Sequence, residues 1–196
     1  MSRIPPLTLI GVSLLFVGTL GCASSRNERS QEERGPSSPA RIVEQYFEAM
    51  KEGNWVRCAE LMHPEALDRF KDILLDITEI DTAGTFLTRF FGDGTTPASF
   101  QAMPRQEAFA TFTTRVLSRE PEYGEILASM AFSLIGHVNE TDSLTHVLYR
   151  MKLEYSGLTM SEIEVISLKQ LESSWGVLLT RDVENMAEAV KQQFIR

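Results

Sequence analysis

The sequence predicts an α+β protein in which N-terminal helices pack on a curved antiparallel sheet of about four strands, with a further helix at the C-terminus. Between residues 39 and 117, apolar residues recur every three or four positions, as on one face of a helix. Between residues 132 and 179 they recur at every second position, as along half-buried strands. Helices followed by strands favour an α+β arrangement over an alternating α/β one.

The composition is that of a folded, acidic domain. The chain has 196 residues, 43% of them hydrophobic, and 19 Lys and Arg against 27 Asp and Glu give a net charge of −8. This length suits one domain with its own core. The acidic balance argues against nucleic acid as a partner. Two cysteines, no Gly-rich phosphate loop and no His-Glu-x-x-His motif predict neither a metal nor a cofactor.

The N-terminus has the pattern of a targeting segment. Residues 7–20 carry no charge and follow Arg3. A membrane-spanning helix needs about 20 apolar residues, so this run has the length of a signal-peptide core instead. It ends in Thr19-Leu20-Gly21-Cys22, which resembles the lipobox of bacterial lipoproteins, although Thr19 stands where that family most often has Leu. The alternative is a buried N-terminal helix with an incidental cysteine.

The lipobox resemblance implies an address in the cell envelope. Residues 1–21 would be a lipoprotein signal peptide, and Cys22 would become the first residue, carrying palmitate and a diacylglyceryl group that anchor the protein in a membrane. Ala23 stands in place of the Asp that favours the inner membrane, so a Gram-negative cell would hold the protein on the periplasmic face of the outer membrane. Residues 22–38 contain no large apolar residue and are expected to form a disordered tether.

The remaining residues, 39–196, are expected to form a single α+β cone domain. Ser38 and Pro39 have the residue types of a helix N-cap and first turn. Gly53 ends this first helix, Asn54 caps a second, and His63 precedes a third that begins with Pro64. His63 is expected to bond local carbonyl groups at this helix end.

The segment after the third helix is less regular. Residues 86–91 form a short aromatic stretch whose structure the sequence leaves open. Residues 92–103 are rich in Gly, Pro, Ser and Thr, which predicts a long loop. A further helix follows from Pro104, and the last helix carries Val183, Met186, Val190 and Phe194 on one face.

The alternating segments predict an antiparallel meander and a register. Phe132 and Leu134 should lie beside Met151 and Tyr149, on an inner face that Val138, Ile163 and Val165 also share and that no Asp or Glu interrupts. If the same inner face continues onto the next strand, Leu153 pairs with Ile163 and Lys152 lies opposite Glu164. The outer face would then carry Ile135, Leu148, Ile166 and Leu168, covered by the C-terminal helix or by a second subunit.

The helical opening resembles that of nuclear-transport-factor-2-like domains, which have a cystatin-like cone fold. The residues that carry the resemblance are Val43-x-x-Tyr46-Phe47-x-Ala49-x-x-x-Gly53-x-Trp55-x-x-x-Ala59-x-Leu61-Met62-His63-Pro64. Ser174-Trp175-Gly176-Val177 resembles a late strand of that superfamily, although its Gly and Trp stand in a different order. The C-terminal helix is a departure, because many members end on a strand. The resemblance implies a pocket at the open end of the cone.

Aromatic residues at inward positions are the candidates for lining this pocket, and each of them is equally typical of a plain core. They are Tyr46, Trp55, Phe90, Phe91, Phe112, Tyr149 and Tyr155. The function we expect from the sequence is a lipid-anchored binding or scaffold module without catalytic activity. Its partner would be an envelope protein, a second copy of the chain bound through the sheet face, or an apolar small molecule.

The alternative function is an isomerase- or cyclase-like enzyme, which the superfamily resemblance implies. Such chemistry needs a carboxylate base near apolar surface and an acidic hydrogen-bond donor. Tyr46 is the candidate donor, and Asp68, Asp72 or Asp182 the candidate base. His137 and His146 could lie opposite each other on neighbouring strands, but no third metal ligand accompanies them.

Overall fold

The computed structural model describes residues 38–119, 121–155 and 157–194. The expected signal peptide, Cys22 and the tether up to residue 37 lie outside the described residues. The described chain is α+β: helices come first, a four-stranded antiparallel sheet follows, and a helix closes the chain. The predicted fold class is therefore confirmed. None of the described helices is both long and apolar enough to cross a bilayer.

The first three helices of the domain begin at the capping residues that the sequence predicts. Their bounds are α2 Pro39–Lys51, α3 Trp55–Leu61, α4 Pro64–Ile80, α5 Thr85–Phe91, α6 Pro97–Ala102, α7 Arg105–Leu117, α8 Pro121–Ser129 and α9 Arg181–Gln192. Ser38 caps α2, and Asn54 caps α3 by accepting a bond from the backbone N–H of Arg57 at 3.1 Å. Gly53 follows α2 with φ of +66°, a conformation that costs glycine little.

Two helix predictions need correction. The expected loop at residues 92–103 contains α6, because Thr96 and Ser99 form a capping box and Pro97 starts the helix. His63 caps α4 as an acceptor: its Nδ1 takes a hydrogen bond from the backbone N–H of Glu65 at 3.2 Å, rather than donating to carbonyl groups.

The sheet has the order β1-β2-β3-β4, so within the described residues β1 and β4 are its edges. The strands are β1 Ala131–Thr141, β2 Leu144–Tyr155, β3 Leu158–Gln170 and β4 Trp175–Val177. The predicted first pairing is confirmed, because Phe132 lies opposite Met151 and Leu134 opposite Tyr149.

The predicted register between β2 and β3 is wrong by three residues. Leu153 pairs with Met160, and Lys152 lies opposite Ser161. The reason is the turn: Tyr155 pairs with Leu158, and Gly157 reverses the chain with φ of +78°. The connection is therefore shorter than the predicted pairing of Leu153 with Ile163 requires. An odd shift exchanges the two faces of β3.

This exchange changes which residues face the helices. Ile166 and Leu168, expected outside, are 1% and 0% exposed. Ile163 and Val165, expected inside, are 56% and 54% exposed.

The same exchange puts Glu162 and Glu164 on the inner face of the sheet, opposite Met151 and Tyr149. The expected charge-free inner face is therefore wrong. Both glutamates are exposed.

A bulge in β1 causes the third correction. Leu134 pairs with Tyr149 and Gly136 with Leu148, so Ile135 is an extra residue on β1. The residues after it change faces, and Val138, expected inside, is 59% exposed on the outer face opposite His146.

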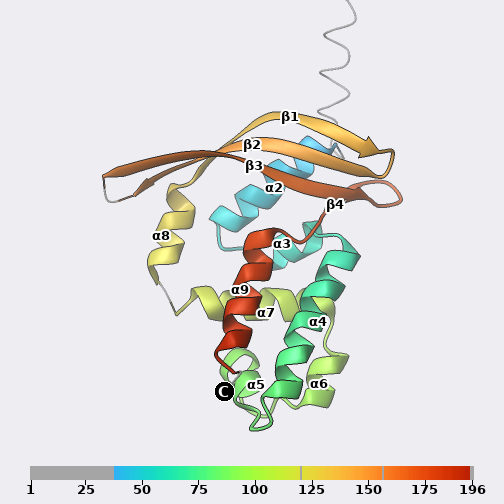
Figure 1. Ribbon diagram of the computed structural model, residues 1–196, viewed down its shortest axis with the longest axis vertical. Coiled ribbons are helices and arrows are strands. Elements are labelled where there is room, and N and C mark those ends of the chain that lie inside the picture. The colour runs from blue at the N-terminus through green and yellow to red at the C-terminus, as the bar shows by residue number, and fades with distance from the viewer. Residues whose placement is uncertain (1–37, 120, 156, 195–196) are drawn as a thin grey trace, which may run out of the picture.

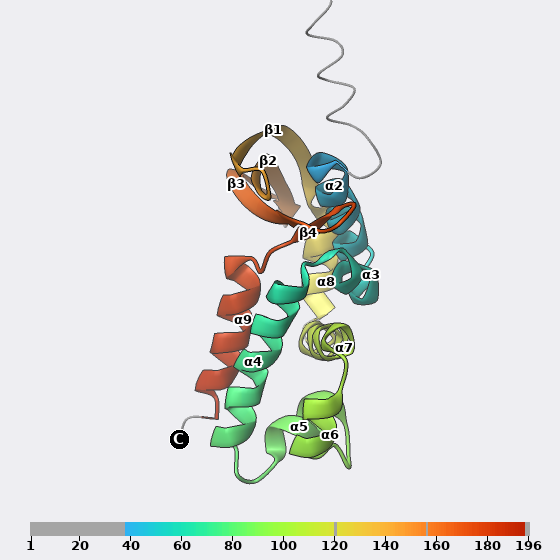
Figure 2. The ribbon, with the colours of Figure 1, turned by 90° about the vertical axis from the view of Figure 1, so that its right-hand side faces the viewer.

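The sheet forms one end of the molecule and most helices form the other (Figure 1). Helix α2 lies against the inner face of the sheet and contacts β1, β2 and β4. Helices α4, α5, α6, α7 and α9 extend away from the sheet (Figure 2). Helix α9 packs along α4 rather than over the outer face, so the C-terminal helix is not the cover expected there.

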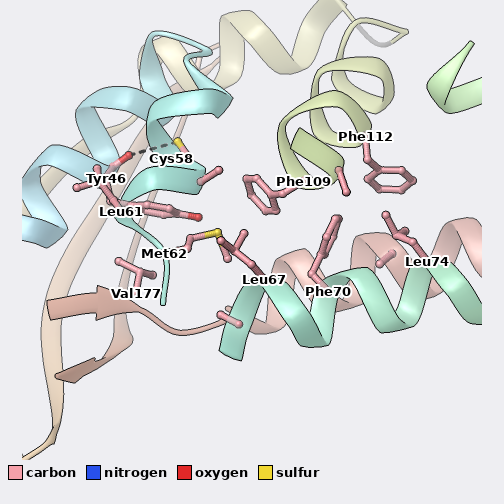
Figure 3. Packing of buried hydrophobic residues seen from close by; sticks show 14 of the residues in the cluster. Tyr46, Cys58, Leu61, Met62, Leu67, Phe70, Leu74, Phe109, Phe112 and Val177 are labelled. Carbon is pink, nitrogen blue, oxygen red and sulfur yellow. Dashed lines mark hydrogen bonds between the residues drawn. The ribbon is translucent and has the colours of Figure 1, made fainter. Parts of the chain in front are cut away.

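The helical half is held by aromatic packing. Phe109 and Phe112 of α7 point toward Phe70 of α4 (Figure 3), with ring centroids 5.1 Å and 5.6 Å from that of Phe70. Each of these rings is no more than 1% exposed. Such edge-to-face contacts add to the hydrophobic free energy of burial.

The two halves join where β4 meets the start of α4. The backbone N–H of His63 donates to the carbonyl of Val177 at 2.8 Å, and Met62 and Val177 form a parallel bridge. Gly176 allows this approach, because a Cβ there would lie 2.7 Å from the His63 Cα. This glycine therefore sets the distance between the sheet and the helices.

Candidate functional site

Two adjoining hollows lie between α2 and the edge strand β1, and together we call them the α2–β1 groove. The first has a volume of about 660 Å³ and the second about 290 Å³. The first is lined by Ala40, Arg41, Glu44, Leu134, Ile135, Gly136, His137 and Val147. The second is lined by Glu44, Phe47, Glu48, Lys51, Phe132, Ser133 and Leu134.

The groove exists because of local sequence on both sides. On α2, Ala40 contributes only a methyl group, and on β1 Gly136 contributes no side chain. Gly136 pairs with Leu148 of the outer face, so it lines the groove through its backbone. The bulge at Ile135 bends β1 at the same place. A small helix residue that faces a bent strand leaves a hollow that a larger side chain would fill.

An aromatic cluster fixes the other end of the groove. The ring of Phe47 on α2 stacks on that of Phe132 on β1, with centroids 4.0 Å apart and planes inclined by 9°. Tyr149 on β2 lies beside Phe47 at 4.6 Å. These contacts hold α2 against the sheet, so the groove has a rigid, apolar wall.

The rim of the groove is charged but balanced. Arg41 and Glu44 form an ion pair at 3.0 Å, both about half exposed. Glu48 and Lys51 lie farther along the same side of α2 and also line the groove. Two cations and two carboxylates cancel, so the rim selects neither an anion nor a cation strongly.

The strand beside the groove has an unpaired edge. In the part of the chain that the structure describes, β1 pairs with β2 alone. Edge strands expose backbone N–H and C=O groups to which another extended chain can bind. The bulges at Ile135 and between Asn139 and Thr141 limit how long a regular ladder can extend there.

The structure does not bring the predicted pocket aromatics together around one pocket. None of the seven lines either hollow of the groove. Phe90 and Phe112 lie in the helical half with centroids 5.2 Å apart, 3% and 0% exposed, and Phe91 lies near them.

The other four pocket candidates lie nearer the sheet. Tyr46 and Tyr149 lie at the contact between α2 and the sheet, and Trp55 is half-buried at the start of α3. Tyr155 is at the end of β2, and its side chain is outside the described part of the structure.

Tyr46 and Cys58 are buried close together. The Cys58 thiol donates to the backbone carbonyl of Tyr46 at 3.9 Å (Figure 3). Burial raises the pKa of the Tyr46 hydroxyl far above its ordinary value, and Cys58 and Tyr149 raise it further. Burial also raises the pKa of the Cys58 thiol to about 12. Neither group is placed to titrate near neutral pH.

The carboxylates proposed for an enzyme do not lie beside Tyr46. Asp68 is exposed and accepts from Arg105 at 2.8 Å. Asp72 is also exposed, and the Asp182 side chain is outside the described residues. Among the described side chains, no Asp or Glu is buried. The tyrosine–carboxylate pair needed by the enzyme alternative is therefore not formed by Asp68 or Asp72.

The two strand histidines lie on opposite faces of the sheet. His137 pairs with Val147 on the inner face, and His146 pairs with Val138 on the outer face. The expected juxtaposition is wrong because the bulge at Ile135 moves the pairing by one residue. No group of three or more His, Cys, Asp or Glu within the described ranges is arranged to hold a metal ion.

His146 belongs instead to a chain of hydrogen bonds on the outer face. Its Nε2 is 2.6 Å from Glu140 Oε2, and its Nδ1 is 2.9 Å from Ser167 Oγ. The connectivity is that of a serine-hydrolase triad. Ser167 lies inside the ladder, however: β2 pairs with it on one side, and its carbonyl accepts from Leu178 on the other. These hydrogen bonds therefore tie β1, β2 and β3 together.

Sequence analysis missed the groove residues on α2 and β1. Ala40, Arg41 and Glu44 have ordinary helix residue types, and the bulge that opens the groove has no signature beyond Gly136. The only signal on α2 was the small residue Ala40, and its meaning becomes clear once the packing of α2 on β1 is known.

No protein-family profile and no curated protein sequence matches the chain. Among solved structures, the chain is similar to an NTF-2-like protein of unknown function from Shewanella oneidensis MR-1. The two share 9% sequence identity with a TM-score of 0.40, over 71% of this chain and 91% of that chain. That description names the superfamily that the helical opening resembles. The α+β fold of this chain stands on its own elements, and membership of the superfamily stays a prediction.

Proposed function

We propose that this chain is a non-catalytic binding module of the bacterial cell envelope, held to a membrane by a lipid on Cys22. The α2–β1 groove takes an extended peptide segment of an envelope protein. The observation that carries the proposal is the position of the groove: an open hollow runs beside a strand that, in the described part of the chain, has an unpaired edge.

The shape of the groove favours a peptide over a compact ligand. Its residues on α2 extend from Ala40 to Lys51. At about 1.5 Å per helical residue the groove is roughly 16 Å long, which equals about five residues of extended chain. A peptide of that length can bind backbone groups of β1 and place alternate side chains between the strand and α2.

The charges of the rim describe the partner's chemistry. Because the charges of Arg41, Glu44, Glu48 and Lys51 cancel, the bound segment should itself carry no net charge. The acidic remainder of the domain would repel acidic partners and would not attract a neutral one. An apolar small molecule in the same groove is the alternative occupant.

Site-specific photo-cross-linking tests the peptide. A benzophenone amino acid in place of Glu48, on the rim of the groove, should give a discrete cross-linked protein product in intact cells. The matched control is the same amino acid in place of Glu79, which is exposed near the end of α4. No product at position 48, or equal products at both positions, would contradict a peptide-binding groove. Native mass spectrometry of the purified chain then identifies a small-molecule occupant.

Metabolic labelling tests the anchor separately. In cells that express Cys22→Ser, the protein should no longer incorporate labelled palmitate. Cys58→Ala is the matched control, because Cys58 is 0% exposed in the domain and should leave the label unchanged. A labelled Cys22→Ser protein, or an unlabelled natural chain, would contradict the anchor.

A further inference from the structure

The outer face of the sheet carries an apolar patch that no part of the described chain covers. Leu148 and Val165 lie opposite each other at its centre, and Ile163 and Val138 flank them. Ile163, Val165 and Val138 are each more than half exposed. The C-terminal helix packs on α4 at the other side of the sheet, so it leaves this patch open.

Charged residues separate between the two faces of the β2–β3 hairpin. Arg150 and Lys152 lie on the outer face, opposite Ile163 and Ser161. Glu162 and Glu164 lie on the inner face, opposite Met151 and Tyr149. The other outer-face acids of this region are Glu154 near the hairpin end and Glu140, which binds His146. Two cations, Arg150 and Lys152, therefore lie beside the apolar patch, and Glu154 follows two residues farther along the same face of β2.

The start of the domain lies at the same end of the molecule as this face. Helix α2 begins beside β1, at the sheet end, and the other helices extend in the opposite direction (Figures 1 and 2). By composition, residues 22–38 predict a tether with a mean reach of roughly 20–25 Å. A lipid on Cys22 would hold the sheet end, rather than the helical end, near the membrane.

We propose that the outer face of the sheet contacts the surface of the bilayer in which Cys22 is anchored. This inference rests on the anchor in the proposed function. Val165, Ile163 and Leu148 contact the acyl–headgroup boundary, and Arg150 and Lys152 bind anionic headgroups. The acidic helical half is repelled by the same headgroups, so charge and hydrophobicity favour one orientation. In that orientation the α2–β1 groove lies next to the membrane, where segments of envelope proteins emerge.

The test uses the full lipidated chain in vesicles of phosphatidylethanolamine and phosphatidylglycerol, with the lipid on Cys22 verified first by mass. A polarity-sensitive fluorophore is attached at Val165→Cys or, separately, at Thr88→Cys on α5 at the helical end. Cys58 is buried and does not compete for the label. At position 165 we expect a blue-shifted emission that lipid-borne quenchers reduce, and at position 88 we expect the emission of a water-exposed dye. Ile163→Cys replaces Val165→Cys if that variant unfolds at lower temperature.

Each other result overturns the inference. A water-exposed dye at position 165 on an anchored chain would contradict the membrane contact of the sheet and would not contradict the lipid anchor. A dye shielded without lipid quenching indicates a second copy or another protein on the patch. Equal quenching at both positions indicates contact without orientation. An absent lipid on Cys22 is a failure of the proposed function itself.

The role of Arg150 and Lys152 is tested with an unanchored chain that begins at position 22 and carries Cys22→Ser, because the apolar leader at residues 7–20 would itself bind vesicles. Replacing both Arg150 and Lys152 by Gln should weaken its partitioning onto the same vesicles by roughly 30-fold, from the usual contribution of a cation near an anionic surface. The matched control replaces Arg89 and Arg115, exposed cations of α5 and α7, by Gln and should change partitioning little. Equal losses for the two pairs would overturn the role assigned to the outer face.

Discussion

Gly176→Ala should destabilise the protein by separating its two halves. Gly176 lies in β4, where the sheet meets the start of α4, and the added Cβ would lie 2.7 Å from His63 Cα and 2.8 Å from His63 N. Both are backbone atoms, so no side chain can rotate away. His63 caps α4, and its N–H donates to Val177 at 2.8 Å. Relieving the contact must therefore move the start of the helix or lengthen that bond.

The magnitude follows from these two costs. Overpacking in a well-packed core costs about 1–3 kcal/mol. Weakening one backbone hydrogen bond costs about 1 kcal/mol more. Together they lower the free energy of unfolding by about 2–4 kcal/mol, which lowers the Tm of a domain of this size by roughly 5–15 °C.

Urea unfolding followed by circular dichroism, together with a thermal scan, measures the change. Gly136→Ala is the matched control: it is also a strand glycine, and nothing lies within 4 Å of the added Cβ. We expect Gly136→Ala to remain within about 0.5 kcal/mol of the natural chain. If Gly176→Ala were equally mild, the close approach of β4 to His63 would not determine how the two halves join.

Three further predictions concern single buried groups. Thr113→Val should raise the free energy of unfolding in urea by about 1 kcal/mol, because the buried Thr113 hydroxyl has no hydrogen-bond partner among the described residues. A lower free energy of unfolding would show that this hydroxyl has a hydrogen-bond partner. Burial lowers the pKa of His63, so the unfolded chain binds this proton more readily. Stability should therefore be greatest above the ordinary histidine pKa of about 6.5 and decrease as the pH falls below it, and His63→Asn should flatten that part of the profile. In the Cys22→Ser chain, Cys58 is the remaining thiol, and burial raises its pKa to about 12. At pH 8 it should therefore react with Ellman's reagent on the order of a thousandfold more slowly in the folded protein than in the unfolded protein. Equal rates would show that the thiol is accessible.

The inner face of the sheet changes what can be argued about function. An inner face without carboxylates would favour a binding module over an acid–base enzyme, and Glu162 and Glu164 on that face remove this argument. Both glutamates are exposed, and Tyr46 has no carboxylate beside it among the described side chains. The proposal of a binding module now depends on the α2–β1 groove and on the unpaired edge of β1.

The sequence by itself determined the features that depend on neighbouring residues. Helix starts at Ser38, Asn54 and His63 follow from capping chemistry within a few residues. The α+β class and the pairing of Phe132 with Met151 follow from hydrophobic periods and a short hairpin. These features need no knowledge of distant contacts.

Only the tertiary structure decided the strand register and the facing of side chains, which depend on how many residues each turn and bulge contains. β3 carries apolar residues on both faces, with Ile163 and Val165 on one and Ile166 and Leu168 on the other, so hydrophobicity alone gives two acceptable registers. The turn at Gly157 selects one of them, and the extra residue at Ile135 moves Val138 outward and opens the groove beside Gly136. Because side chains alternate with a period of two, one residue more or fewer in a turn or bulge reverses a whole face, and that count is set by how the strands pack against α2.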